Sequence, residues 1–212
     1  MVFFDIHTHR VPLHSGRAVV SFPAGEETCL SAATYASVGI HPWHLSESEV
    51  ERRLAALKTL ATHENVVAIG EVGLDKLAEA PLALQMCVFR EEIALAEHLC
   101  LPLVIHCVRA FNELLQLKKE LHPGQPWVIH GFRGKAELAD MCIRHGCYLS
   151  FGAKFQEAAL RAVPLDRLFV ETDEAQEPVA EIYRRIAEVR GISVEHLADA
   201  VNKNARKVFF RH

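Results

Sequence analysis

The sequence predicts an α/β protein, a compact TIM (β/α)8 barrel, on the strength of three observations. Eight short apolar runs rich in β-branched and aromatic residues recur along the 212-residue chain. Helical patterns separate the later runs, and strands that alternate with helices are typical of parallel βαβ units. Ionisable side chains gather where the runs end, and the carboxyl ends of barrel strands all meet on one face.

The apolar runs define the expected strands, which lie at 2–6, 18–22, 35–40, 66–70, 101–106, 126–130, 147–152 and 167–172. The first two connections, 7–17 and 23–34, are short, and proline and glycine interrupt both. Because these residues disfavour helix interiors, we expect the first two βα units to be abbreviated.

Five amphipathic patterns predict helices in the later connections. Ser46 and Glu49 have the spacing of a capping box in front of the first helix, 50–60. Apolar side chains three or four residues apart mark the other helices, near 86–100, 114–121, 138–145 and 194–208. No linker, internal repeat or low-complexity tract divides the chain, so residues 1–212 are expected to form one domain.

The bulk composition is that of an ordinary globular protein. Half of the residues are apolar, 24% are charged, and the net charge is -4, which gives no sign of a polybasic nucleic-acid binder. No apolar run is long enough to cross a membrane, and no signal peptide is recognisable. The six cysteines form no CxxC pair and are expected to be reduced thiols, so we expect a cytoplasmic protein without a membrane partner.

Side chains of metal-ligand type stand at or just after the ends of six expected strands: His7, His9, His41, Glu71, His106, His130 and Asp173. Any single histidine among them could be a polar strand end or a hydrogen-bonded core residue. Burying so many ionisable groups together without a cation would be costly, whereas divalent metals use these ligand types. The set therefore predicts a metal site.

At these positions the chain resembles the TatD-type metal-dependent hydrolases of the amidohydrolase superfamily. The segments DIHTH, VGIHP, AIGEVGLD, LVIHC, VIHGFRG and ETD occur in the family's order and spacing, and the resemblance covers essentially the whole chain. It implies a TIM barrel with one or two divalent metal ions (Mg, Mn or Zn) that hydrolyses phosphodiesters, DNA 3′-end trimming being a familiar activity. It further implies a first metal held by His7, His9, Glu71 and Asp173, and a second held by Glu71, His106 and His130.

Two carboxylates carry the expected catalytic roles. Glu71 would bridge the two metals, and Asp173 would accept a proton from the attacking water. His41 would face the substrate rather than bind metal, and His44 is best explained as a surface residue of its loop.

Cations also follow several of the expected strands: Arg10, Lys76, Arg109, Arg133 and Lys154. Loops commonly carry solvated cations, but this set also favours an anionic substrate such as a phosphoester. The family usually has Arg and then Asp at the positions of Val108 and Arg109, and an aromatic residue at the position of Lys76. These departures lie in loops that would face the substrate. A helix after strand 101–106 would turn Arg109 away from the family's position, so Arg133 and Lys76 are expected to be the better contacts.

The preferred function is therefore metal-dependent hydrolysis of phosphodiester bonds, with single-stranded DNA or a DNA end as a candidate substrate. A small phosphoester, another ester or an amide is the alternative. A non-catalytic barrel with a structural metal is less favoured, because Asp173 is available as a base and His41 as a spare histidine. Oligomeric state and metal identity stay open.

Overall fold

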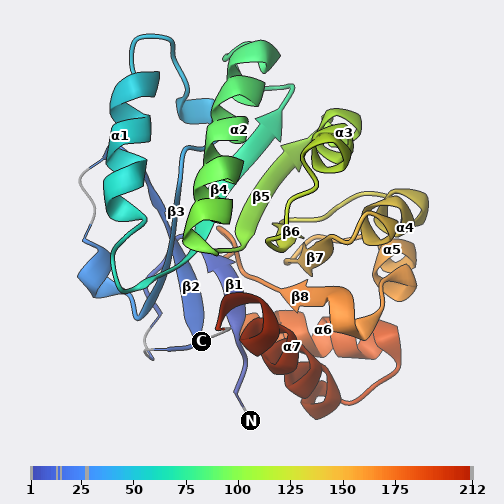
Figure 1. The fold of residues 1–212 in the computed structure, drawn as a ribbon. Coiled ribbons are helices and arrows are strands. Elements are labelled where there is room, and N and C mark those ends of the chain that lie inside the picture. Colours follow the sequence, from blue (N-terminus) through green and yellow to red (C-terminus); the bar gives the residue numbers. More distant parts are fainter. Residues whose placement is uncertain (1, 13, 15, 27–28, 211–212) are drawn as a thin grey trace.

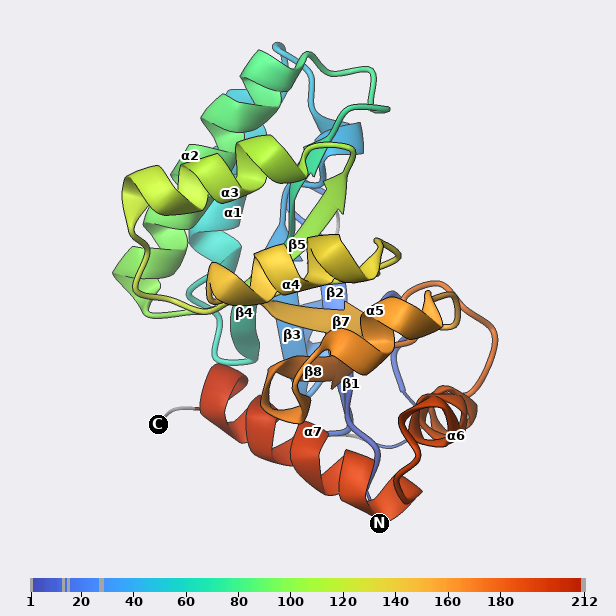
Figure 2. The ribbon, with the colours of Figure 1, turned by 90° about the vertical axis from the view of Figure 1, so that its right-hand side faces the viewer.

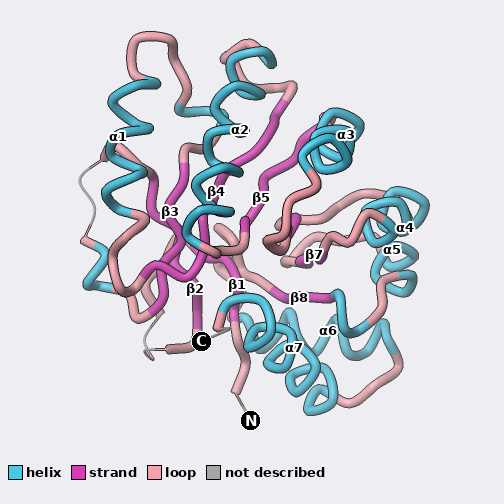
Figure 3. The backbone as a smooth tube through the Cα atoms, in the orientation of Figure 1, coloured by secondary structure: helices cyan, strands magenta, loops and turns pink. Residues whose placement is uncertain are grey.

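Eight parallel strands form a nearly closed barrel, which confirms the predicted fold class. The computed structural model describes residues 2–12, 14, 16–26 and 29–210. Each strand pairs with the next in chain order, and helices surround the sheet on the outside (Figures 1 and 3). The strands are β1 (Asp5–Thr8), β2 (Ala18–Pro23), β3 (Tyr35–Gly39), β4 (Val66–Asp75), β5 (Leu103–Val108), β6 (Trp127–Ile129), β7 (Tyr148–Phe151) and β8 (Leu168–Val170).

Helices occupy the later connections, as expected. They are α1 (Val50–Leu60), α2 (Leu82–Leu99), α3 (Phe111–Leu121), α4 (Ala136–Arg144), α5 (Glu157–Ala162), α6 (Val179–Arg190) and α7 (Val194–Phe209). The sequence patterns did not predict α5 or α6. Short 3-10 turns lie at η1 (Leu30–Ala32), η2 (Pro42–His44) and η3 (Leu165–Arg167). Within the described part of the first two connections η1 is the sole helical turn, so these βα units are abbreviated as predicted.

The capping box predicted for α1 does not form. The backbone amides of Glu49 and Val50 both donate to the Ser46 carbonyl oxygen at 3.1 Å, and the Ser46 hydroxyl lies beside that of Ser48. Glu49 itself occupies the N-cap position in a helical conformation, and its carboxylate pairs with Arg52. A turn therefore separates Ser46 from the start of the helix, and the two side chains have other partners.

β4 and β5 both run beyond the ends that the sequence predicted. β4 continues past Glu71 to Asp75, and β5 continues past His106 to Val108. In this extension Gly73 pairs with His106, and a Cβ atom at position 73 would lie 2.1 Å from the His106 carbonyl oxygen. Glycine permits this close approach. Glu71 and His106 are consequently held inside paired strands rather than at free strand ends.

The barrel closes where β1 meets the segment after β8. The Asp173 amide donates to the His7 carbonyl oxygen at 2.9 Å, and the His9 amide donates to the Asp173 carbonyl oxygen at 3.4 Å. The Asp5 carboxylate accepts hydrogen bonds from the Thr172 amide at 3.0 Å and the Thr172 hydroxyl at 2.7 Å. Burial raises the pKa of Asp5 to about 7, although the bonds from Thr172 oppose this shift. These contacts align two segments that lie at opposite ends of the sequence.

α7 covers the amino-terminal end of the barrel, opposite the strand ends that carry the predicted site (Figure 2). Phe209 packs 5.7 Å from the ring of Phe169, and Phe210 lies 5.8 Å from Phe4 and 4.6 Å from Tyr35. The apolar stripe that predicted the helix is largely buried, at Leu197, Val201, Ala205 and Val208. No helix in the described ranges has both the length and the apolarity needed to cross a membrane.

Glu92 is a carboxyl group fully enclosed between α2 and the barrel. Its Oε1 atom accepts a hydrogen bond from the Ile40 amide at 2.9 Å. Burial raises the pKa of Glu92 well above its ordinary value, because that single bond does not compensate a desolvated charge. The folded protein therefore holds this group as a neutral acid over a pH range in which the unfolded chain ionises it.

We expect Glu92→Gln to change how stability depends on pH. Above the ordinary glutamate pKa the unfolded parent loses this proton while the folded parent retains it, so the free energy of unfolding falls as pH rises. The variant has no such proton to lose. Its free energy of unfolding should therefore exceed that of the parent by an amount that grows between pH 5 and pH 8, by up to about 1.4 kcal/mol per pH unit. Urea unfolding of both proteins across that range measures the difference. Parallel profiles would show that Glu92 is ionised in the folded state.

Candidate metal centre

The Glu71 carboxylate lies at the centre of the predicted site, and one of its oxygens faces the barrel closure. Glu71 Oε2 is 3.5 Å from His7 Nε2 and 3.4 Å from His9 Nε2. Asp173 Oδ1 is 3.8 Å and 3.6 Å from the same two nitrogens. Two imidazoles and two carboxylates thus converge on one point.

The other oxygen of Glu71 faces a second group of histidines. Glu71 Oε1 is 2.8 Å from His130 Nε2, 3.1 Å from His106 Nδ1 and 3.1 Å from His41 Nε2. The structure therefore brings together all six predicted ligands, and adds His41 to the second group. A carboxylate with one oxygen in each group has the geometry of a bridging ligand.

Two further carboxylates lie beside outer nitrogens of the second group: Asp75 forms a hydrogen bond to His106, whereas Glu171 approaches His130 without one. Asp75 Oδ2 lies 3.0 Å from His106 Nε2, and Glu171 Oε1 lies 3.4 Å from His130 Nδ1 while accepting a bond of 2.6 Å from the Gly131 amide. Metal-binding histidines commonly use the distal nitrogen in this way, which fixes the ring and its tautomer. No sequence pattern indicates these roles of Asp75 and Glu171.

Burial and the charges within the cluster shift the pKa values of its side chains. Hydrogen bonds to Asp173 and Glu71 raise the pKa of His9 to about 9, against the opposing effect of burial. Burial disfavours the charge on Glu71, but the imidazoles of His130 and His106 outweigh it and hold its pKa well below the ordinary value. Burial lowers the pKa of His41. Protons on these imidazoles and divalent cations would compete for the same lone pairs.

The donor set fits divalent metal ions. His7 is completely buried, and within the described part of the chain neither of its ring nitrogens has a hydrogen-bond partner. Its neighbours supply imidazole nitrogen and carboxylate oxygen, which suit zinc and manganese. Groups such as His7–His9–Asp173 and His41–Glu71–His106 offer ligand atoms within 4.8 Å of one another.

The predicted substrate contacts are placed unequally. Arg133 lines a cavity of about 460 Å³ that also contains Glu71 and Asp173. The sequence placed Arg109 on a helix, and this prediction is wrong. Arg109 lies in the turn between β5 and α3 with a φ of 56°, and it lines a neighbouring cavity beside Arg133. The ammonium of Lys76 pairs with Glu113 at 2.6 Å, and Lys76 is not among the described residues that line either cavity.

An exposed tryptophan forms part of the rim of the larger cavity. Trp43 is 65% exposed, and its Nε1 donates to Asp75 Oδ2 at 2.7 Å. The amide of Trp43 also donates to His41 Nδ1 at 3.1 Å, so the η2 turn holds both side chains beside the site. The sequence signal was present, since Trp43 lies between His41 and His44, but the surface interpretation of that loop obscured it.

A nearly closed α/β barrel with histidines and carboxylates gathered on one face defines the class of metal-dependent barrel hydrolases. Residues 24–210 match the family model described as TatD related DNase. The chain therefore belongs to this family, which confirms the resemblance seen in the sequence motifs.

Relatives and solved structures agree with this assignment. The chain is 36% identical over 197 residues to the metal-dependent hydrolase YabD of Bacillus subtilis, with 82% of this chain and 77% of the relative covered. It is 31% identical over 205 residues to the 3′-5′ ssDNA/RNA exonuclease TatD of Erwinia billingiae, with the same coverage. The crystal structure of YJJV, a TatD homolog from Escherichia coli, has the same fold, with a TM-score of 0.83, 24% identity and 98% of each chain covered.

We expect Glu71→Ala to lose metal ions while a matched carboxylate variant does not. Mn²⁺ or Zn²⁺ at about a hundredfold excess over its dissociation constant should raise the Tm of the parent by roughly 5–10 °C. This shift should largely disappear in Glu71→Ala and persist in Glu113→Ala, whose carboxylate lies on α3 beside Lys76. Metal content by mass spectrometry and thermal unfolding give independent measurements. Full metal content in Glu71→Ala would exclude a bridging role.

Proposed function

We propose that the protein hydrolyses phosphodiester bonds in nucleic acid, acting on single strands or strand ends, with two divalent metal ions. The observation that carries this proposal is the Glu71 carboxylate, whose two oxygens face two separate groups of nitrogen and oxygen donors. The names of the relatives, which include a 3′-5′ ssDNA/RNA exonuclease and a deoxyribonuclease, support the same chemistry. Two divalent cations in such a site supply a water of lowered pKa and stabilise negative charge on the phosphoryl oxygens.

The chain's own residues would hold the metal ions, accept a proton and bind the phosphate. Glu71 would fix the distance between the two donor groups, while His7, His9, His106 and His130 complete them. Asp173 is the best candidate to accept the proton of the attacking water, because its partly exposed carboxylate lines the cavity and a pKa below the ordinary value keeps it ionised and free of a proton. Burial opposes that pKa shift, whereas His9 and the neighbouring imidazoles favour it. Arg133 would bind a phosphate oxygen at the rim.

His41 has two possible roles in this scheme. Its Nε2 atom points at Glu71 in the same way as those of the second group, which favours a place among the ligands. Its Nδ1 atom accepts the Trp43 amide, so only Nε2 is available for binding or for proton transfer. We assign it to the second donor group or to the substrate bound there.

Trp43 favours nucleic acid over a small phosphoester. The indole ring is exposed at the cavity and anchored by its Nε1 hydrogen bond to Asp75, so it offers a fixed face for stacking of a base. A small phosphoester has no need of such a platform. The six cysteines are all free thiols, which supports a reducing compartment such as the cytoplasm.

We expect Asp173→Asn to separate catalysis from metal binding. An amide cannot accept the proton, so kcat should fall by about 10²–10⁴-fold. Metal content should change much less than in Glu71→Ala. The measurement is turnover of bis-(p-nitrophenyl) phosphate together with metal analysis of each purified variant. Equal metal losses in the two variants would make Asp173 mainly a ligand and overturn its assignment as the base.

We expect Trp43→Ala to affect only substrates that carry stacked bases. KM for a short single-stranded DNA should rise about fivefold or more, since stacking on an aromatic side chain contributes about 1–3 kcal/mol per base. KM for bis-(p-nitrophenyl) phosphate should stay close to that of the parent. Trp43→Phe should recover part of the DNA binding, whereas Arg133→Ala should weaken the binding of both substrates. Equal effects of Trp43→Ala on both substrates would favour the small phosphoester.

A further inference from the structure

A second cavity lies at the opposite end of the barrel from the candidate metal centre. Its lining comes from the end of α3, from the loops that precede β6 and β7, from η3 before β8, and from α7. These segments lead into the amino-terminal ends of the strands, whereas the candidate ligands lie toward the carboxyl ends. The cavity has a volume of about 590 Å³, which is within the usual range for small-molecule sites.

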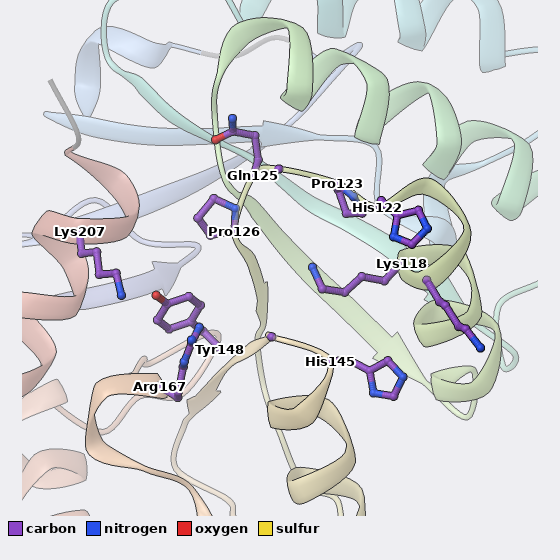
Figure 4. A pocket seen from close by; sticks show the side chains of 12 residues that line it. Lys118, His122, Pro123, Gln125, Pro126, His145, Tyr148, Arg167 and Lys207 are labelled. Atoms are coloured by element: carbon purple, nitrogen blue, oxygen red, sulfur yellow. The ribbon is translucent and has the colours of Figure 1, made fainter.

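Apart from the Tyr148 phenol, the ionisable side chains among the described residues that line this cavity are basic: Lys118, Lys119, His122, His145, Arg167 and Lys207. No carboxylate is among the described residues that line it. Figure 4 shows Lys118, Arg167 and Lys207 approaching the same space from three different elements. Four permanent cations around one concave surface produce a local field quite unlike the acidic balance of the whole chain.

Aromatic rings, rather than carboxylates, position two of these cations. Lys118 Nζ lies 4.5 Å from the centroid of the Trp127 ring, and the Arg167 guanidinium lies 4.8 Å from that of Tyr148. Among the described residues neither cation has a carboxylate within ion-pair distance. A cation over a ring face keeps its N–H groups available to a ligand, which an ion pair would occupy.

Burial partly removes two of these cationic side chains from water. Lys118 and Arg167 are only half-exposed. Burial lowers the pKa of Lys118, and nearby Arg167 adds to this effect, while Glu97 and Cys147 oppose it. An anion bound between the two side chains would relieve this unfavourable burial of charge.

The loop that forms one wall is fixed by the Glu97 carboxylate. Both oxygens of Glu97 accept backbone hydrogen bonds, from the Gly124 amide at 3.0 Å and the Gln125 amide at 2.9 Å. Glu97 is thereby directed at the backbone and does not pair with Lys118. The wall is held in place before any ligand arrives, which reduces the entropic cost of binding.

We propose that this cavity binds a small polyphosphate anion, either free or as the polyphosphate group of a nucleotide. Four cations from α3, η3 and α7 match an anion with several negative charges, and the guanidinium fork of Arg167 suits paired phosphate oxygens. A concave pocket of this volume favours a small molecule over a continuous nucleic-acid strand. The site is separate from the candidate metal centre and does not depend on the function proposed for it.

The test is calorimetric titration of the purified protein, dialysed free of excess metal, with sodium tripolyphosphate, with ATP and with a single-stranded oligonucleotide. We expect the parent to bind tripolyphosphate, and the double variant Lys118→Gln/Arg167→Gln to bind it about tenfold more weakly or worse. Glu71→Ala should bind as the parent does, because its carboxylate lies at the other end of the barrel. ATP that binds more tightly than tripolyphosphate would identify a nucleotide as the ligand, whereas equal affinity would identify the free anion.

Two controls keep the result interpretable. The variant Lys119→Gln/Lys207→Gln leaves the contacts of Lys118 with Trp127 and of Arg167 with Tyr148 in place, and it should also bind tripolyphosphate more weakly than the parent. It tests the same cavity if Lys118→Gln/Arg167→Gln fails to fold. Lys58→Gln, on α1 beside Glu91, is a matched lysine control that should leave binding unchanged. Equal affinity of the parent and both double variants would overturn the proposal. It would also be overturned if the oligonucleotide alone bound in a manner sensitive to these substitutions, since the surface would then serve nucleic acid.

Discussion

The backbone of Asp173 pairs with both His7 and His9 at the point where the first strand meets the end of the last one. This junction closes the barrel, and it also sets the spacing of three of the six predicted ligands. Asp5 strengthens it through two hydrogen bonds to Thr172, just beside the junction. Sheet closure and the assembly of the candidate metal centre are therefore one structural event, since neither end of the chain supplies a complete donor group alone.

The sequence predicted the strands well and singled out the side chains that the structure brings together around Glu71, because both depend on local signals. Apolar runs mark strands, and a charged residue inside such a run is conspicuous, as with Glu71. The orientation of side chains does not follow from such local signals. Asp75 and Glu171 acquire their roles from the register of neighbouring strands, and the position of Arg109 depends on a left-handed turn that no apolar period indicates. The ion pair of Lys76 with Glu113 likewise joins residues 37 positions apart.

The two ends of the barrel differ in the charged side chains that gather there. At the carboxyl ends of the strands, carboxylates and imidazoles crowd together, and Glu71 interacts with five histidines. At the amino-terminal ends, cations collect around aromatic rings with no carboxylate among the described residues of the lining. The same fold thus presents a site suited to cations on one face and a site suited to anions on the other, with the apolar core between them.

Each of these faces contains one of the two tryptophans in the chain. Trp43 is exposed at the rim of the candidate metal centre, whereas Trp127 is buried beneath Lys118 at the basic cavity. An indole in water emits at longer wavelength than one in an apolar interior, so the intrinsic fluorescence of this protein has two components with separate origins. Quenching by an aqueous solute would reach Trp43 and spare Trp127. The two components therefore give each face its own optical label, without any added probe.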